Sequence, residues 1–138
     1  MSRILVAVSS PWASQRVIET VGDLAQRIGA EVLVVHVSRP SGGQMREQEQ
    51  ADGESAVRLL SEQLQTRGLT VQTLLMFSDD IARAIVNTSV ERDVTLIVLG
   101  LTGKNVFARL LAGNVPVELI KNTRIPVLLL PADFGKPL

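Results

Sequence analysis

Short apolar runs alternate along the chain with longer stretches in which apolar residues recur every three or four positions. Five runs are rich in Val, Ile and Leu, and they cover residues 3–8, 31–37, 70–76, 95–100 and 125–130. The first, fourth and fifth runs are apolar at nearly every position, which is typical of strands buried on both faces of a parallel sheet. The pattern therefore predicts five strands in an α/β protein.

Between these runs, the apolar residues follow the period of a helix over residues 12–29, 54–67, 80–92 and 115–123. In the first of these segments Val17, Val21 and Leu24 share a stripe, and Gly29 is a stop signal. Strands that alternate with helices predict a parallel sheet with right-handed crossovers and helices on both faces. The polar, glycine-rich segment 39–53 is predicted to be a mobile loop.

Composition narrows the class of protein. The 138 residues are 46% hydrophobic, which suits a single globular domain over residues 1–138. Fourteen basic residues balance fourteen acidic ones, so we expect no nucleic-acid partner and no attraction to an anionic membrane. There is no cysteine, which excludes disulfides, thiolate metal sites and a cysteine nucleophile. The apolar run over residues 4–8 is too short to insert into a membrane, so we expect a cytoplasmic protein.

One stretch carries a pattern that could bind a ligand. The sequence GLTGKNVFARLLAGN places Gly100, Gly103 and Gly113 between a buried strand and the last helix. Backbone N–H groups of such a loop, together with the helix N-terminus behind it, can bind an anion, and Lys104 and Arg109 could add positive charge. The glycines could equally serve only to make a turn. The residues alone leave both readings open.

The same stretch resembles the universal stress protein family. The resemblance is carried by ILVAVSS near the start, VVHV in the second strand, and VLGLTGKNVFARLLAGNVPVELIKNTRIPVLLL, and it covers nearly the whole chain. It implies a three-layer α/β/α fold, similar to the adenine nucleotide alpha hydrolase-like fold, with a five-stranded parallel sheet in the order 3-2-1-4-5. ATP-binding members carry Gly-x₂-Gly-x₉-Gly followed by Ser or Thr. The resemblance therefore implies ATP or another adenine nucleotide as ligand, and Mg²⁺ could accompany ATP.

Carried over position by position, the resemblance predicts a nucleotide site. It comprises Ala7, Ser9, Val37, Leu99, Gly100, Gly103, Lys104, Gly113, Asn114 and Val115. Ser9 stands where ATP-binding relatives have an aspartate that binds the ribose, and a serine is a shorter and uncharged partner. Asn114 replaces the usual hydroxyl residue, although Asn can still cap the helix and donate to a phosphate.

The leading hypothesis is an adenine-nucleotide-binding (ATP or AMP) regulatory protein of the stress response. The resemblance implies a homodimer paired through the last strand, Pro126–Leu130, which is an apolar edge that needs covering. The alternative is a domain of the same fold that has lost nucleotide binding and acts on a protein partner, which Ser9 and Asn114 favour. A slow ATPase is the third hypothesis, but no residue is a convincing catalytic base.

Other candidate residues favour structural roles. His36, the single histidine, lies within the second strand and is expected to be structural. Asp79 and Asp80 could hold Mg²⁺, but acids before a helix more often cap it. We therefore predict no catalytic residue and no resident metal site.

Overall fold

The computed structural model describes residues 1–9, 11–40, 43–100, 115–131 and 134–138. Strands and helices alternate along it as the hydrophobic pattern predicts. The elements are β1 (Arg3–Ala7), α1 (Pro11–Ile28), β2 (Glu31–Ser38), α2 (Gly43–Thr66), β3 (Val71–Phe77), α3 (Ile81–Glu91), β4 (Leu96–Gly100), α5 (Val115–Asn122) and β5 (Val127–Leu130). Their bounds lie within one or two residues of the predicted ones, except at the start of α2.

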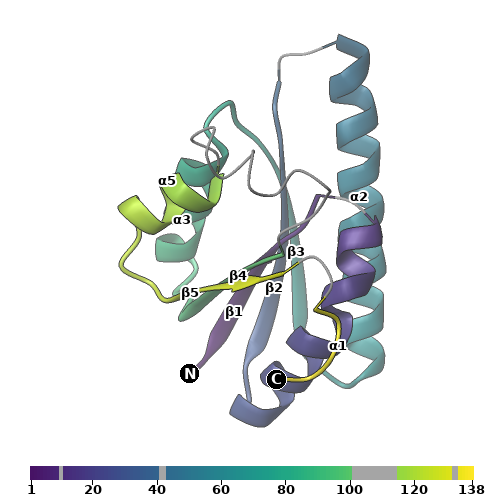
Figure 1. The fold of residues 1–138 in the computed structure, drawn as a ribbon, viewed down its shortest axis with the longest axis vertical. Helices are drawn as coiled ribbons and strands as arrows, with labels where there is room; N and C mark the ends of the chain where they lie inside the picture. The colour runs from purple at the N-terminus through teal and green to yellow at the C-terminus, as the bar shows by residue number, and fades with distance from the viewer. Residues whose placement is uncertain (10, 41–42, 101–114, 132–133) are drawn as a thin grey trace.

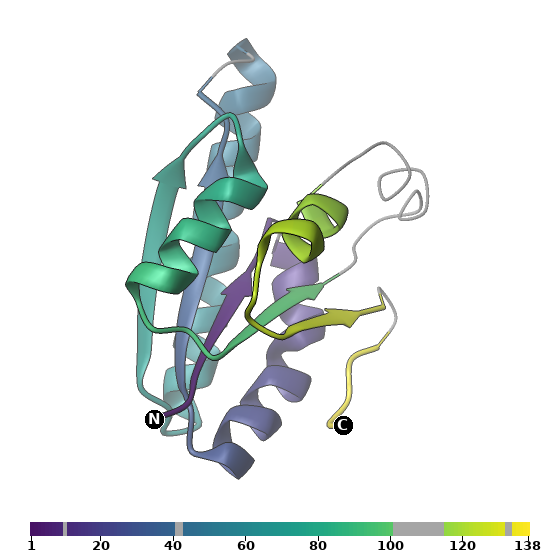
Figure 2. The same ribbon diagram turned by 90° about the vertical axis from the view of Figure 1, so that its left-hand side faces the viewer.

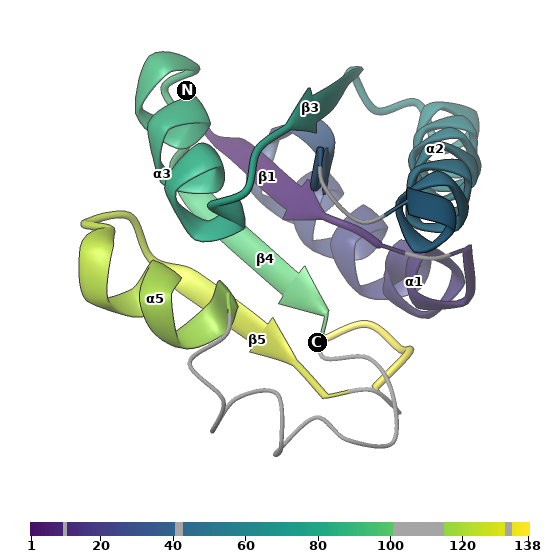
Figure 3. The same cartoon turned by 90° about the horizontal axis from the view of Figure 1, so that it is seen from above.

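The strands form one parallel sheet in the order β3-β2-β1-β4-β5, which confirms the predicted order. Helices α1 and α2 cover one face, and α3 and α5 cover the other (Figures 1 and 3). Figure 2 shows α3 and α5 side by side in front of the sheet, with β3 and β5 at its two edges. The three layers therefore follow from two crossovers on each face.

Alternate side chains of β1 feed two separate cores. Ile4 and Val6 are fully buried against α1 and α2, whereas Leu5 is fully buried on the face of α3 and α5. Burying an aliphatic side chain of this size stabilises the fold by about 1.5–3 kcal/mol. The unbroken apolar run that follows Arg3 in this central strand is thus what a sheet covered on both faces requires.

Helix α2 corrects the predicted mobile loop over residues 39–53. The helix begins at Gly43, so residues 43–53 are helical and not a loop. Within this polar segment, Glu47 and Gln48 are exposed to solvent. Its Gln, Glu, Arg and Met residues are good helix formers. The Gln48 amide also donates to the Asp52 carboxylate one turn later, at 2.9 Å.

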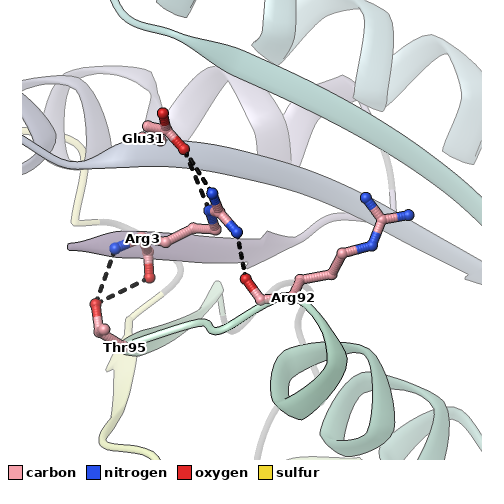
Figure 4. A network of polar contacts seen from close by, with 4 residues as sticks. All are labelled: Arg3, Glu31, Arg92 and Thr95. Atoms are coloured by element: carbon pink, nitrogen blue, oxygen red, sulfur yellow. Dashed lines mark hydrogen bonds and ion pairs between the residues drawn. The ribbon is translucent and has the colours of Figure 1, made fainter. Parts of the chain in front are cut away.

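The amino-terminal edge of the sheet is closed by a polar network around Arg3 (Figure 4). The Arg3 guanidinium donates to Glu31 Oε2, with Nη2 at 2.8 Å, and also to the Arg92 carbonyl. The main-chain N–H of Arg3 donates to Thr95 Oγ1 at 2.9 Å. These bonds join β1 to β2 and to the α3–β4 connection. The polar groups of Arg3, Glu31 and Thr95 at this edge are thus hydrogen-bonded within the protein.

The carboxyl-terminal segment returns along α1 toward the amino-terminal edge (Figure 1). Thr20 Oγ1 of α1 donates to the carbonyl of Lys136 at 2.6 Å. Phe134 packs against the core that α1 and α2 cover. Both chain ends therefore lie at the edge of the sheet that carries the Arg3 network, away from the carboxyl ends of the strands.

Candidate functional site

The carboxyl ends of the strands meet at the edge of the sheet opposite Arg3. Strand β1 leads to α1 on one face, and the neighbouring β4 leads toward α5 on the other face. In open parallel sheets this reversal opens a crevice, and ligands bind there. The point between β1 and β4 is accordingly where the fold places a site.

An apolar floor lies beneath this edge. The side chains of Ala7, Val37 and Leu99 all face α3 and α5 and belong to, or pack against, one core cluster. Ala7 pairs with Leu99 across β1 and β4, and Val37 stands near the end of β2. Val37 and Leu99 are buried, whereas Ala7 is half-buried at the rim. Val115, the half-buried first residue of α5, packs against the same core cluster. The structure therefore places four predicted site residues, Ala7, Val37, Leu99 and Val115, in or against one cluster.

Two further predicted residues lie on the chain segments that leave the sheet. Ser9 lies two residues beyond the end of β1 and is exposed, so a ligand at this edge could reach it. Gly100 is the last residue of β4, and a side chain at this position would point toward α1. A Cβ at Gly100 would stand 3.3 Å from Val17 Cγ1, which is a tight contact. Gly100 therefore also serves the close packing of α1 on the end of β4.

The predicted phosphate loop falls outside the described residues. Gly103, Lys104, Gly113 and Asn114 belong to that segment, and their roles stay predictions. The described chain resumes at Val115, the first residue of α5. A helix that begins there agrees with the predicted start behind Asn114.

The paired acids before α3 are in place for a cap. Asp80 is the N-cap of α3, and its Oδ1 accepts the main-chain N–H of Arg83 at 3.1 Å. Of the two acids that were expected to cap this helix, Asp80 is the one that does so. Across the described residues, His, Asp and Glu side chains form no group of three that could hold a metal. In the same part of the chain, no helix combines the length and apolar character needed to cross a membrane.

A contact that sequence reasoning missed lies just below Ser9. The Nδ1 atom of His36 stands 2.8 Å from the carbonyl oxygen of Val8, and the ring packs on Gly53 of α2. His36 was predicted to be structural, and its burial agrees with that role. A lone histidine in a strand and a glycine 17 residues later carry no pattern that would link them. The link depends on how α2 crosses the sheet.

The fold defines a class: a three-layer α/β protein whose parallel sheet reverses its strand order between β1 and β4. The sequence profile of the Universal stress protein family matches residues 1–131. The chain belongs to the universal stress protein family. No curated protein is a significant match to the chain.

Solved structures of this family share the fold. Universal stress protein UspA from Lactobacillus plantarum is 22% identical, with a TM-score of 0.76 over 94% of this chain and 97% of that one. A universal stress protein in complex with cAMP is 18% identical, with a TM-score of 0.73 over 94% and 96%. The universal stress protein from Archaeoglobus fulgidus in complex with dAMP is 22% identical, with a TM-score of 0.71 over 94% and 97%. The last two proteins bind adenine nucleotides.

Proposed function

We propose that this protein binds an adenine nucleotide at the carboxyl ends of β1 and β4, where the strand order reverses, and acts as a regulatory protein of the stress response. The observation that carries the proposal is the convergence of Ala7, Val37 and Leu99 into one apolar floor at this edge. Ser9 stands open beside that floor, and α5 begins next to it. An apolar surface with a few polar groups at its rim is the usual form of a small-molecule site.

The complexes with cAMP and dAMP support the same ligand class, since both nucleotides carry an adenine base. ATP, with Mg²⁺, is the finer form of the proposal, and it rests on the spacing of Gly100, Gly103 and Gly113. In this proposal the loop supplies N–H groups to the phosphates, and the N-terminus of α5 adds its positive dipole. The bound state, rather than turnover, would be the signal, and the cysteine-free chain suits a reducing cytoplasm.

We further propose that the protein acts as a homodimer through β5. Strand β5 lies at the end of the strand order, and among the described residues it pairs only with β4, so a second strand could pair with its outer edge. Val127, Leu128 and Leu129 are half-buried along it. Beside this edge lies an open hollow of about 360 Å³, bounded by Ile120, Thr123, Arg124, Ile125, Pro126 and Val127. An uncovered apolar edge strand is prone to pair with another chain.

A second candidate function is an interaction domain of the same fold that binds no nucleotide. Ser9 is the observation that favours it, because a neutral hydroxyl replaces the carboxylate at the end of β1. Such a domain would act on a protein partner through its surface. The two candidates differ in one measurable property, the affinity for adenylates.

The Ser9→Asp substitution tests the proposed nucleotide site. An aspartate here can accept hydrogen bonds from both ribose hydroxyls, and a net gain over serine of one charge-assisted bond, about 1.5–3 kcal/mol, should make AMP bind about 10–100-fold more tightly. Isothermal titration of wild type and variant measures the change. The matched control is Ser9→Asn, because asparagine has the shape of aspartate but no charge.

The ligand series separates a ribose contact from a general effect. The gain from Ser9→Asp should vanish with 2′,3′-dideoxy-AMP, which lacks both hydroxyls. Weaker binding of AMP to the variant would mean that position 9 faces the phosphates and not the ribose. An equal gain for both ligands would likewise contradict the assignment.

A further inference from the structure

A buried histidine ties together three chain segments beneath the proposed site. His36 lies near the end of β2 and is only 3% exposed. Its Nδ1 atom stands 2.8 Å from the carbonyl oxygen of Val8, the residue directly before Ser9. On its other side, the ring meets Gly53 in the middle of α2. One side chain thus contacts the end of β1 and the helix that covers it.

The direction of the hydrogen bond follows from its partner. A carbonyl oxygen can only accept, so Nδ1 must carry the proton and donate it to Val8. In the neutral ring the Nε2 atom is then an acceptor, and it has no hydrogen-bond partner among the described residues. The ring therefore has a single polar contact there, and that contact fixes its orientation.

Gly53 holds the ring in place from the other side. A Cβ at this position would stand 2.1 Å from both Cδ2 and Nε2 of His36, so the ring lies almost on the helix backbone. This contact leaves the imidazole little room to rotate or withdraw from Val8. It also accounts for a glycine in the interior of a helix, where glycine otherwise weakens the fold.

The hydrogen bond acts at the point where β1 ends. The Val8 N–H still donates to the Val35 carbonyl at 2.9 Å, but the regular strand stops at Ala7. Val8 is buried, so its carbonyl oxygen needs a partner away from water. His36 supplies that partner and sets the path of the chain into Ser9.

We propose that His36 is a positioning residue for the nucleotide site, which it serves by fixing the Val8 carbonyl and hence the placement of Ser9. This inference rests on the proposed nucleotide binding. His36 itself touches no ligand in this account, because its ring is enclosed between β1, β2 and α2. Its effect on affinity passes through the main chain.

The test compares His36→Leu with His36→Asn. Both changes remove the ring, but the Asn side chain can place an N–H donor near the position of Nδ1 and bond the Val8 carbonyl again. We expect His36→Leu to weaken AMP binding about tenfold, the scale of one lost hydrogen bond, and His36→Asn to stay near wild type. A merely structural role would weaken both variants alike or leave both affinities unchanged, and either result would overturn the proposal.

Two measurements without nucleotide keep this test separate from the proposed function. Hydrogen exchange should accelerate in His36→Leu for amides of residues 6–9, but not for residues 96–99 of β4. The imidazole nitrogen spectrum, unambiguous because the chain has one histidine, should show a protonated Nδ1 and an unprotonated Nε2. A wild-type protein that binds no adenylate would refute the proposed function. Unchanged exchange at residues 6–9, or a protonated Nε2 with a bare Nδ1, would refute the positioning role.

Discussion

Replacing Gly53 by valine is expected to lower the free energy of unfolding by about 2–4 kcal/mol, since it overpacks the core and breaks a buried hydrogen bond. The new side chain would enter the space of the His36 ring, which lies 2.1 Å from an ideal Cβ. Either the ring leaves the Val8 carbonyl or α2 moves away from the sheet. Chemical denaturation gives the change, provided that the m-value stays constant.

Ala51→Val is the matched control for this prediction. Ala51 lies on the same helix but is exposed, so the change there costs only the difference in helix propensity, about 0.5 kcal/mol. If both substitutions lowered the free energy of unfolding equally, the His36 ring would have room to move away from the new side chain. That result would contradict the close packing of His36 on α2.

Replacing Gly113 by valine should abolish the thermal stabilisation that AMP or ATP gives. The position is the last glycine of the Gly-x₂-Gly-x₉-Gly spacing, and a branched side chain there would block the approach of a phosphate to the backbone N–H groups. It lies outside the described residues, so this prediction rests on the spacing and on the place of α5. Melting temperatures with and without nucleotide measure the effect.

Gly135→Val makes the same chemical change far from the proposed site. Gly135 is exposed in the carboxyl-terminal segment that runs along α1. Its nucleotide-induced shift in melting temperature should match that of the wild type. A full shift in Gly113→Val would instead remove the loop from the site, even if the protein binds nucleotide elsewhere.

The hydrophobic pattern predicted most of the fold because burial on both faces leaves a distinct mark. Strand β4 and the part of β1 that follows Arg3 have no polar side chain, as strands covered on both faces require. The start of α2 was not predictable in the same way. Residues 47–52 are exposed or half-buried, so this part of the helix lacks an apolar stripe and resembles a polar loop until Gly53.

The candidate site was predictable in part. Residues at the carboxyl ends of strands, such as Val37 and Leu99, can be placed once the strand order is known, because parallel strands end at one edge. The bond from His36 to the Val8 carbonyl could not be found in this way. It depends on the register of β1 and β2 and on the orientation of the imidazole ring, which a residue pattern does not encode.

The most direct test of the account is a titration of isotopically labelled protein with AMP, followed by amide chemical shifts. We predict saturable shifts concentrated at the carboxyl edge, around Ser9, Val37 and Gly100, while Arg3 and Thr95 at the amino edge stay unmoved. No saturable change at millimolar AMP, ATP or cAMP would contradict nucleotide binding and favour the interaction domain. Saturable shifts centred on Arg3 and Thr95 would contradict the placement of the site.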